Sequence, residues 1–216
     1  MLLLLVRHGD TALTSKQLVG RTPGVHLDDR GRAQAAGLPA RLEGLPVTSI
    51  ISSPLDRAVE TATPLAEARG LEVTQEAGLL EVDYGDWTGK AYKELRRTDL
   101  WKRVQVLPAD ARFPGGEAMR EAQARIAGAL ERICAASPGT EGVVAVSHSD
   151  MIKAAVAHLL GLHLDLFQRL VVSPASVTAL WVGEGQPRLL RLNDTGTMQD
   201  LRPPRRRRGG RRGAEN

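Results

Sequence analysis

Two histidines stand directly after short apolar runs near opposite ends of the chain. His8 follows the apolar run 2–6, with Arg7 before it and a glycine after it. His148 follows the apolar run 143–146 and is separated from it by one serine. Short apolar runs that end in charge or glycine are typical of buried parallel strands. Because ligands of open α/β sheets bind beyond the carboxyl ends of the strands, we expect one site that contains both imidazoles.

A second arginine follows another predicted strand. Residues 48–51 are predicted to form that strand, and Arg57 comes shortly after its end. A pocket with Arg7, Arg57 and two histidines would bind a tetrahedral dianion, since guanidinium groups match phosphate oxygens bidentately. A helix predicted to begin near Ser149 adds backbone N–H donors and the positive end of its dipole. We therefore expect the two arginines, His148 and Ser149 to bind phosphate.

An imidazole of this site is a candidate nucleophile. A neutral imidazole is competent to attack phosphorus, and two neighbouring arginines should lower its pKa and keep it unprotonated. The same arginines would neutralise charge on the transferring phosphoryl group. The leaving alkoxide needs a proton, which a carboxylic acid of raised pKa can supply. The expected intermediate is a phosphohistidine, which water then cleaves while the acid acts as a base.

The composition narrows the class of protein. The chain has 216 residues, 42% of them hydrophobic, which is enough for one α/β domain with a sizeable core. The single cysteine, Cys134, cannot form an intrachain disulfide, and this fits a reducing compartment, so we expect a cytoplasmic protein. No stretch is long enough to cross a membrane. No residues have metal-ligand spacing, so neither a metal nor another cofactor is expected.

The charge is unevenly distributed along the chain. Residues 202–216 have seven arginines and one glutamate and a net charge of +6, whereas residues 1–201 have a net charge of −2. We expect a domain over 1–201 followed by a disordered Arg-rich tail. Nucleic acid is an improbable partner of the folded part, and any such contact would belong to the tail. An alternative of another class is therefore a protein that binds RNA or acidic partners through this tail. The plainer interpretation of the tail is a solubilising extension.

The predicted elements alternate between strands and helices. A helix capped by Asp28 or Asp29 should run to about Glu43, and a helix over 55–69 should precede a strand over 71–74. The later predicted elements are helices over 91–97, 117–136 and 151–160, an irregular segment over 108–116, and strands over 143–146, 170–172, 177–182 and 188–192. The fold class expected from this order is a three-layer α/β/α structure with a mostly parallel central sheet.

Five ordered segments resemble the motifs of the histidine phosphatase superfamily, in its phosphoglycerate-mutase-like branch with the Arg-His-Gly signature. The segments are 6–11 with Arg7-His8-Gly9, 52–62, 80–89, 113–117 and 146–148. The similarity covers roughly residues 3 to 195, and five matches in the right order are more specific than any one motif. The resemblance implies a phosphoglycerate-mutase-like fold.

The resemblance also implies roles for individual residues. His8 would be the nucleophile, and Glu81 would be the proton donor, with Asp83 as its rival. Arg7, Arg57 and His148 would bind the phosphate. Thr14 stands where the family usually has an asparagine that contacts phosphate, and its hydroxyl can still donate a hydrogen bond. Ser149 replaces a frequent glycine, and only its backbone N–H is needed.

Two residues of a turn are candidate contacts to the rest of the substrate. Arg21 and Thr22 lie in a glycine- and proline-rich segment, where a plain turn role is the alternative for Arg21. The expected partner of the site is a small phosphate ester. A homodimer is a possible assembly.

The resemblance leaves two reactions open, hydrolysis of a phosphomonoester on a small metabolite and a phosphoglycerate-type phosphomutase reaction. In the mutases that the sequence resembles, an arginine directly follows the catalytic glutamate. Here Val82 follows Glu81, and Asp83 adds negative charge that should repel a second anionic group. The segment 90–114 is short and lacks the paired-arginine, proline-rich stretch of the mutases. Water should then reach the phosphohistidine, so hydrolysis is the expected outcome.

Overall fold

The computed structural model describes residues 1–137, 139, 141–183 and 185–196. The predicted Arg-rich tail over 202–216 lies outside the described residues. None of the helices that the structure describes combines the length and the apolar character needed to cross a bilayer.

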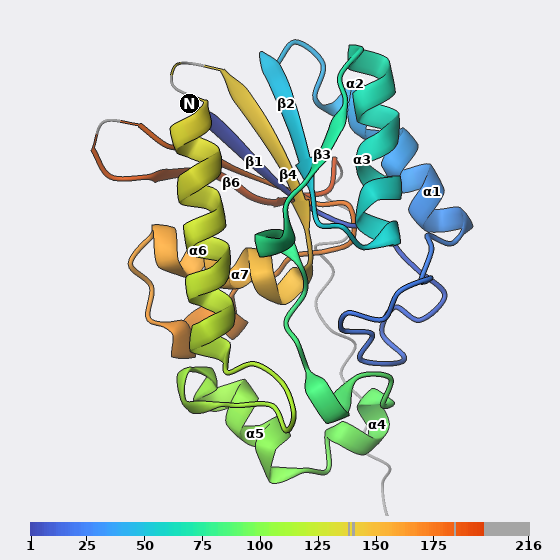
Figure 1. Ribbon diagram of the computed structural model, residues 1–216, viewed down its shortest axis with the longest axis vertical. Helices are drawn as coiled ribbons and strands as arrows, with labels where there is room; N and C mark the ends of the chain where they lie inside the picture. The colour runs from blue at the N-terminus through green and yellow to red at the C-terminus, as the bar shows by residue number, and fades with distance from the viewer. Residues whose placement is uncertain (138, 140, 184, 197–216) are drawn as a thin grey trace, which may run out of the picture.

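The described residues form a six-stranded sheet with the strand order β3-β2-β4-β1-β5-β6 (Figure 1). The strands are β1 Leu2–Arg7, β2 Val47–Ser52, β3 Val73–Gln75, β4 Gly142–Ser147, β5 Val177–Trp181 and β6 Arg188–Asp194. Strands β1 to β4 run parallel to one another, and β5 runs antiparallel to β1 and β6. This mixed sheet confirms the predicted α/β class with a mostly parallel centre.

Helices cover both faces of the sheet because alternate residues of the buried strands face opposite sides. Leu3 and Leu5 of β1 join the apolar cluster under α6 and α7, whereas Leu4 and Val6 join the cluster under α3. The helices are α1 Asp29–Ala36, α2 Leu38–Arg41, α3 Asp56–Arg69, α4 Tyr92–Leu95, α5 Asp99–Val106, α6 Met119–Ala136 and α7 Ser149–Leu159. Short 3-10 helices cover Ala77–Leu79, Gly85–Trp87, Pro108–Asp110 and Leu164–Arg169.

Several predicted boundaries differ from the structure. The helix expected from Asp28 or Asp29 to Glu43 is two helices, because Gly37 separates α1 from α2 and Pro39 in α2 has no N–H to continue the first ladder. The strand expected over 71–74 is displaced to Val73–Gln75. The strand expected over 170–172 does not form, and the Val172 carbonyl instead accepts a hydrogen bond from Arg7.

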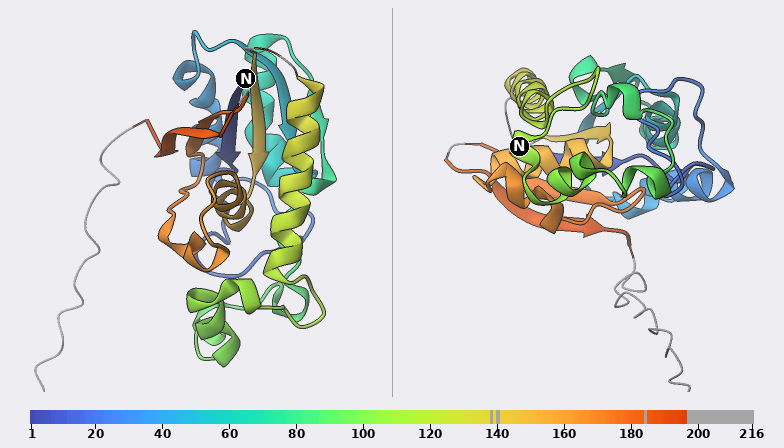
Figure 2. Two further views of the ribbon diagram at one scale, coloured as in Figure 1. Left: turned by 90° about the vertical axis from the view of Figure 1, so that its left-hand side faces the viewer. Right: turned by 90° about the horizontal axis from the view of Figure 1, so that it is seen from below.

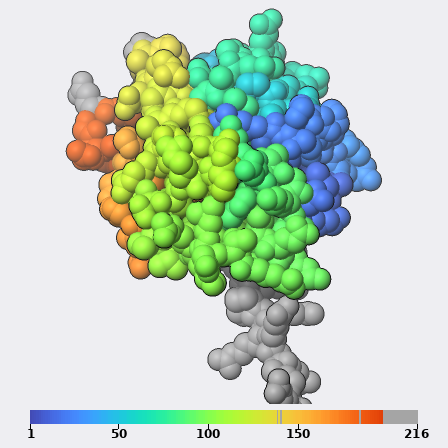
Figure 3. All heavy atoms as spheres, turned by 60° about the horizontal axis from the view of Figure 1, so that its bottom comes forward, coloured from blue at the N-terminus to red at the C-terminus, as the bar shows by residue number. Residues whose placement is uncertain are grey.

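The segment 90–114 folds into a small helical layer, which the sequence predicts only in part. The helix expected over 91–97 is limited to Tyr92–Leu95, and α5 was not predicted. In Figure 1 and in the left view of Figure 2, α4 and α5 lie beyond the carboxyl ends of the strands. Figure 3 shows that this segment and α6 make up much of the face at that end of the molecule.

Helix α1 fixes the loop that follows β1. The N-cap residue Asp28 accepts a hydrogen bond from Gly31 N at 2.8 Å, and its own N–H donates to Asp10 O at 3.1 Å. Gln34 holds Asp10 from both sides, accepting from its backbone N–H at 2.9 Å and donating to its carboxylate at 3.0 Å. A Cβ on Gly31 would lie 2.0 Å from Asp10 O, so only glycine permits this approach.

We expect Gly31→Ala to destabilise the fold by about 1–3 kcal/mol, because the added methyl would displace the backbone of Asp10. The matched control is Gly128→Ala in α6, where a Cβ would meet only the end of Arg132 at 3.6 Å. That change should raise stability by up to about 1 kcal/mol through helix propensity. Urea unfolding of both variants measures the difference. Equal stability of Gly31→Ala and the unaltered protein would contradict this packing.

Candidate active site

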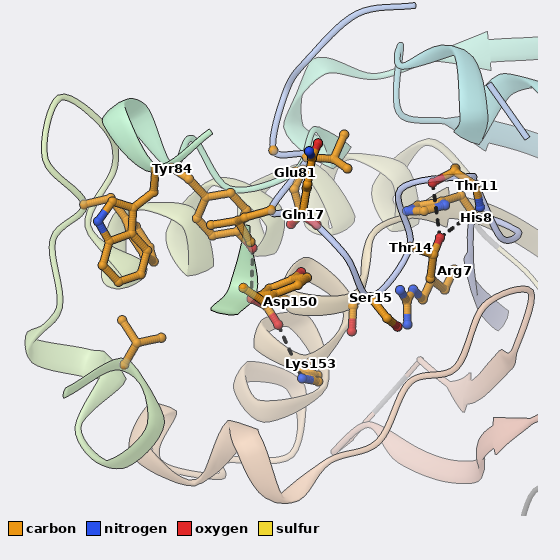
Figure 4. Close-up of a pocket in the computed structure, with 18 of the residues that line it drawn as sticks. Arg7, His8, Thr11, Thr14, Ser15, Gln17, Glu81, Tyr84, Asp150 and Lys153 are labelled. Atoms are coloured by element: carbon orange, nitrogen blue, oxygen red, sulfur yellow. Dashed lines mark hydrogen bonds and ion pairs between the residues drawn. The ribbon is translucent and has the colours of Figure 1, made fainter. Parts of the chain in front are cut away.

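A cavity of about 300 Å³ lies at the carboxyl end of β1 (Figure 4). Its walls come from the loop after β1, from α3, from the segment around Glu81 and Tyr84, and from α5 and α7. Strands β1 and β4 are parallel neighbours in which Arg7 pairs with Ser147, so His8 and His148 leave the sheet side by side. Their ring centroids are 5.2 Å apart. The structure thus brings together the two histidines predicted to share a site.

His8 is buried and held in one orientation by its neighbour. Its Nδ1 lies 2.7 Å from Gly9 O, and since a carbonyl oxygen only accepts, Nδ1 carries the proton. The Nε2 atom therefore keeps its lone pair free. Burial, followed by the charges of Arg57 and Arg7, lowers the pKa of His8 well below its ordinary value. The arginines act as predicted, but burial is the larger cause.

The two arginines present hydrogen-bond donors that lack a partner. Arg7 Nη1 donates to Val172 O at 2.7 Å, and Arg57 Nη2 donates to Gly20 O at 2.7 Å. Arg7 Nε and Arg57 Nη1 are buried without a partner among the described residues. Arg57 is only 2% exposed. Buried guanidinium donors that remain unsatisfied are unfavourable by themselves, so an anion in this cavity would satisfy them.

His148 is fully buried and oriented by two polar contacts. Arg57 Nη2 approaches its Nδ1 at 3.5 Å, and Ser53 Oγ lies 2.8 Å from its Nε2. Because a guanidinium only donates, Nδ1 acts as the acceptor, and Nε2 then donates to Ser53. Burial, together with the nearby charges of His8, Arg57 and Arg7, lowers the pKa of His148. A bound dianion would oppose this shift and favour a protonated His148.

Thr14 and Ser149, the two weaker predicted phosphate contacts, both line the cavity. The Thr14 hydroxyl accepts from Thr11 N at 2.8 Å, so it closes a turn of the loop after β1. Ser149 is the first residue of α7, where backbone N–H groups lack helical acceptors. Both residues are placed where an anion in the cavity could reach them.

Glu81 lines the cavity and is 9% exposed. Its carboxylate accepts from Val82 N at 3.0 Å. Burial, and then the charge of Asp150, raises the pKa of Glu81 to about 7, although Arg57 and Arg7 oppose the shift. The carboxyl group can therefore hold a proton near neutral pH, as the predicted acid requires. Asp83, its predicted rival, is outside the lining of the cavity and forms an ion pair with Arg21 at 3.6 Å.

Arg21 and Thr22 do not line the cavity, and their predicted contacts with the substrate stay a prediction. Arg21 Nε donates to Glu81 O at 2.9 Å, and its Nη2 pairs with Glu117 at 2.9 Å. Arg125 donates to the same Glu81 carbonyl at 3.2 Å and pairs with Glu117 at 2.8 Å. The Thr22 hydroxyl donates to Val19 O at 2.8 Å and closes a turn. Arg21 thus contacts the backbone of the Glu81 loop, while its guanidinium pairs with the carboxylates of Asp83 and Glu117.

Asp150 is a polar group of the cavity wall that the sequence did not predict. Asp150 accepts from the Tyr84 hydroxyl at 2.9 Å and pairs with Lys153 at 3.3 Å, and Figure 4 shows this chain of contacts. Lys153 also donates to Gln168 at 3.2 Å. The available signal was the position of Asp150, in the first turn of the helix that follows His148.

No group of three or more His, Cys, Asp and Glu residues that could hold a metal ion occurs within the part of the chain that the structure describes. Inside the cavity, the charged side chains are instead two arginines, one lysine and two carboxylates: Arg7, Arg57, Lys153, Glu81 and Asp150.

We expect the Glu81 carboxyl to titrate with a midpoint of about 7. Because the folded chain then keeps a proton that the unfolded chain loses near pH 4.5, Glu81 should reduce stability as pH rises from about 4.5 to 7. Carbon-13 NMR of labelled glutamate, with Glu81→Gln for assignment, measures the midpoint. Asp150→Asn should lower that midpoint by removing the like charge. A midpoint near 4.5 would contradict the buried, protonated acid.

Comparison with known proteins agrees with this geometry. The model of the histidine phosphatase superfamily (branch 1) matches residues 3–195. Phosphoserine phosphatase 1 of Hydrogenobacter thermophilus is 33% identical over 89% of this chain and 92% of its own length. A probable phosphoglycerate mutase of Salmonella choleraesuis is 32% identical over 84% of this chain and 85% of its own length.

Solved structures give the same assignment. A mycobacterial glucosyl-3-phosphoglycerate phosphatase superposes with a TM-score of 0.81 and 28% identity, over 89% of this chain and 98% of its own length. The family model spans nearly the whole described chain and includes both histidine motifs, so the chain belongs to the histidine phosphatase superfamily.

Proposed function

We propose that this protein is a phosphomonoesterase that hydrolyses a small phosphorylated metabolite through a phosphohistidine on His8. One observation carries the proposal. The unprotonated Nε2 of His8 shares a cavity with Arg7 and Arg57, each of which has a buried nitrogen that finds no partner among the residues described. Such a cavity binds a phosphate dianion and places a nucleophile beside it.

In the first step, His8 Nε2 forms a bond to phosphorus while the bond from phosphorus to the ester oxygen breaks. Arg7 and Arg57 stabilise the charge on the non-bridging oxygens. His148 joins them as a donor once the dianion favours its protonated form. The hydroxyl of Thr14 and the backbone N–H of Ser149 complete the proposed phosphate site.

Glu81 supplies the proton that the leaving oxygen takes. Its raised pKa keeps the acid protonated near neutral pH until that oxygen becomes basic. After the transfer, the Glu81 carboxylate stands near Asp150, whose charge favours its protonation again. It is therefore a suitable base for the water that attacks phosphorus and regenerates His8.

Hydrolysis is favoured over the mutase reaction by the charges of the cavity. A phosphoglycerate-type mutase has to bind a carboxylate in addition to the phosphate. Beyond Arg7 and Arg57, Lys153 is the one cation among the described residues that line the cavity, and it already pairs with Asp150. A second anionic group would thus find no free cation among these residues.

The interaction protein remains the alternative of another class, but its proposed binding segment, the tail over 202–216, lies outside the described residues. The intact set of groups around His8 supports the enzyme instead. A cytoplasmic location belongs to the proposal as well, since the single cysteine, Cys134, cannot form an intrachain disulfide.

Brief incubation with substrate should leave an acid-labile, base-stable phosphoryl group on His8, because an N–P bond is the proposed intermediate. His8→Ala should fold normally, by circular dichroism, and release no phosphate. The control is His158→Ala, an exposed histidine of α7 that should leave turnover unchanged. Labelling at another residue, or turnover by His8→Ala, would contradict the mechanism.

Phosphate release from a simple monoester such as ethyl phosphate should exceed the interconversion of 3- and 2-phosphoglycerate by at least about tenfold, or about 1.4 kcal/mol of barrier difference. The physical reason is the lack of a free cation for the substrate carboxylate. A coupled assay for 2-phosphoglycerate, with and without the bisphosphate primer, measures the interconversion. If interconversion is the faster reaction, the protein is a mutase.

A further inference from the structure

The aromatic residues of this chain are concentrated in the cavity. The sequence has three tryptophans, two tyrosines and two phenylalanines, and five of these seven line the cavity: Tyr84, Trp87, Tyr92, Trp101 and Phe113. Aromatic residues are only 3% of the chain, so this clustering is not a consequence of general abundance. The phosphate chemistry around His8 uses none of the five.

Three of the five form a rigid floor. Tyr84, Trp87 and Phe113 are at most 5% exposed. The ring of Phe113 meets Tyr84 edge-on at a centroid distance of 4.9 Å and Trp87 at 5.4 Å. Figure 4 shows Tyr84 at the opposite end of the site from His8, with Glu81 and Gln17 between them. The floor therefore lies on the far side of the acid from the nucleophile, where a leaving group would extend.

The other two aromatic residues offer accessible ring surface. Tyr92 of α4 and Trp101 of α5 are only partly buried. Their rings meet at 73° with centroids 5.9 Å apart, and Trp101 also stacks on Trp87 at 6.4 Å. Val104, one turn after Trp101, lines the same cavity. A flat ring can pack into such a corner, stacked on one aromatic ring and edge-on to the other.

The charges in this part of the cavity disfavour an ionic leaving group. Lys153 is neutralised by Asp150 at 3.3 Å, and its ammonium also contacts Gln168. A carboxylate or a second phosphate would therefore find no free cation among the described residues that line this part of the cavity. An uncharged leaving group needs no such cation and gains the apolar surface of the aromatic corner.

We propose that the preferred substrates are phosphomonoesters whose leaving group has an uncharged, planar, unsaturated ring seated against Trp101 and Tyr92. This inference rests on the proposed phosphomonoesterase activity. In the complex, the ester oxygen lies near Glu81, and the ring extends over the floor of Tyr84, Trp87 and Phe113. Trp101 and Tyr92 are then specificity-determining residues, which act on the leaving group and not on the phosphoryl transfer.

The test compares three esters of primary alcohols, benzyl phosphate, ethyl phosphate and O-phospho-L-serine. All three release an alkoxide from a CH₂ group, so differences in kcat/KM report the binding of the leaving group more than its reactivity. We expect kcat/KM for benzyl phosphate to exceed that of the other two by at least about tenfold. A preference for ethyl phosphate or phosphoserine would overturn the inference while it leaves the phosphatase intact.

Variants locate the preference in the structure. Trp101→Leu and Tyr92→Leu should each reduce kcat/KM for benzyl phosphate at least about tenfold more than kcat/KM for ethyl phosphate, and circular dichroism checks that the variants fold. The matched control is Trp181→Leu, since Trp181 lies on β5, is 40% exposed and is outside the cavity lining. A benzyl preference that survives both cavity variants would overturn the assigned corner.

Binding without turnover separates this inference from the proposed function. Benzylphosphonate has no ester bond to break, and it should bind more tightly than ethylphosphonate and quench tryptophan fluorescence. Tighter binding of benzylphosphonate by a protein that hydrolyses no monoester would support the ring site and refute the phosphatase. Equal binding of the two phosphonates would refute the ring site.

Discussion

The site depends on two arginines that, among the described residues, have no carboxylate in direct contact. Arg57 is buried and Arg7 partly buried, each is anchored by one backbone carbonyl, from Gly20 and Val172 respectively, and each has a buried nitrogen without a partner in the part of the chain that the structure describes. Desolvation of an unpaired cation costs several kcal/mol, so binding of an anion next to these arginines is favourable. The charges of the two arginines, together with burial, lower the pKa of His8 and keep it unprotonated. The groups that would bind phosphate therefore also keep the imidazole nucleophilic.

Glu81 shows the opposite balance in the same cavity. Two arginines favour its ionised form, yet burial and the charge of Asp150 outweigh them and raise its pKa to about 7. Asp150 itself accepts a hydrogen bond from Tyr84 and pairs with Lys153. The pKa of Glu81 therefore depends on residues that are not among the proposed phosphate ligands. One cavity thus holds two imidazoles with lowered pKa values, His8 and His148, and a carboxyl group with a raised pKa, Glu81.

The supports of the site come from distant segments. Asp10 is held by α1 through Gln34, and this fixes the loop after His8. The Glu81 loop is held by Arg21 and Arg125, which share Glu117 as a partner. These arginines bind backbone carbonyls and a carboxylate, so they help to position the acid.

Elements with strong local signals could be predicted from the amino-acid sequence. Apolar runs ended by charge or glycine predicted β1 and β4 and placed His8 and His148 at one edge, since parallel strands share their carboxyl ends. The contacts of Arg21 could not be predicted in this way and required the folded structure, because they include Glu117, 96 positions away in the chain. The folded structure also decided that α5 covers the site and that the aromatic residues of 84–113 face one cavity, since no local periodicity records the packing of a helical layer against a distant strand edge.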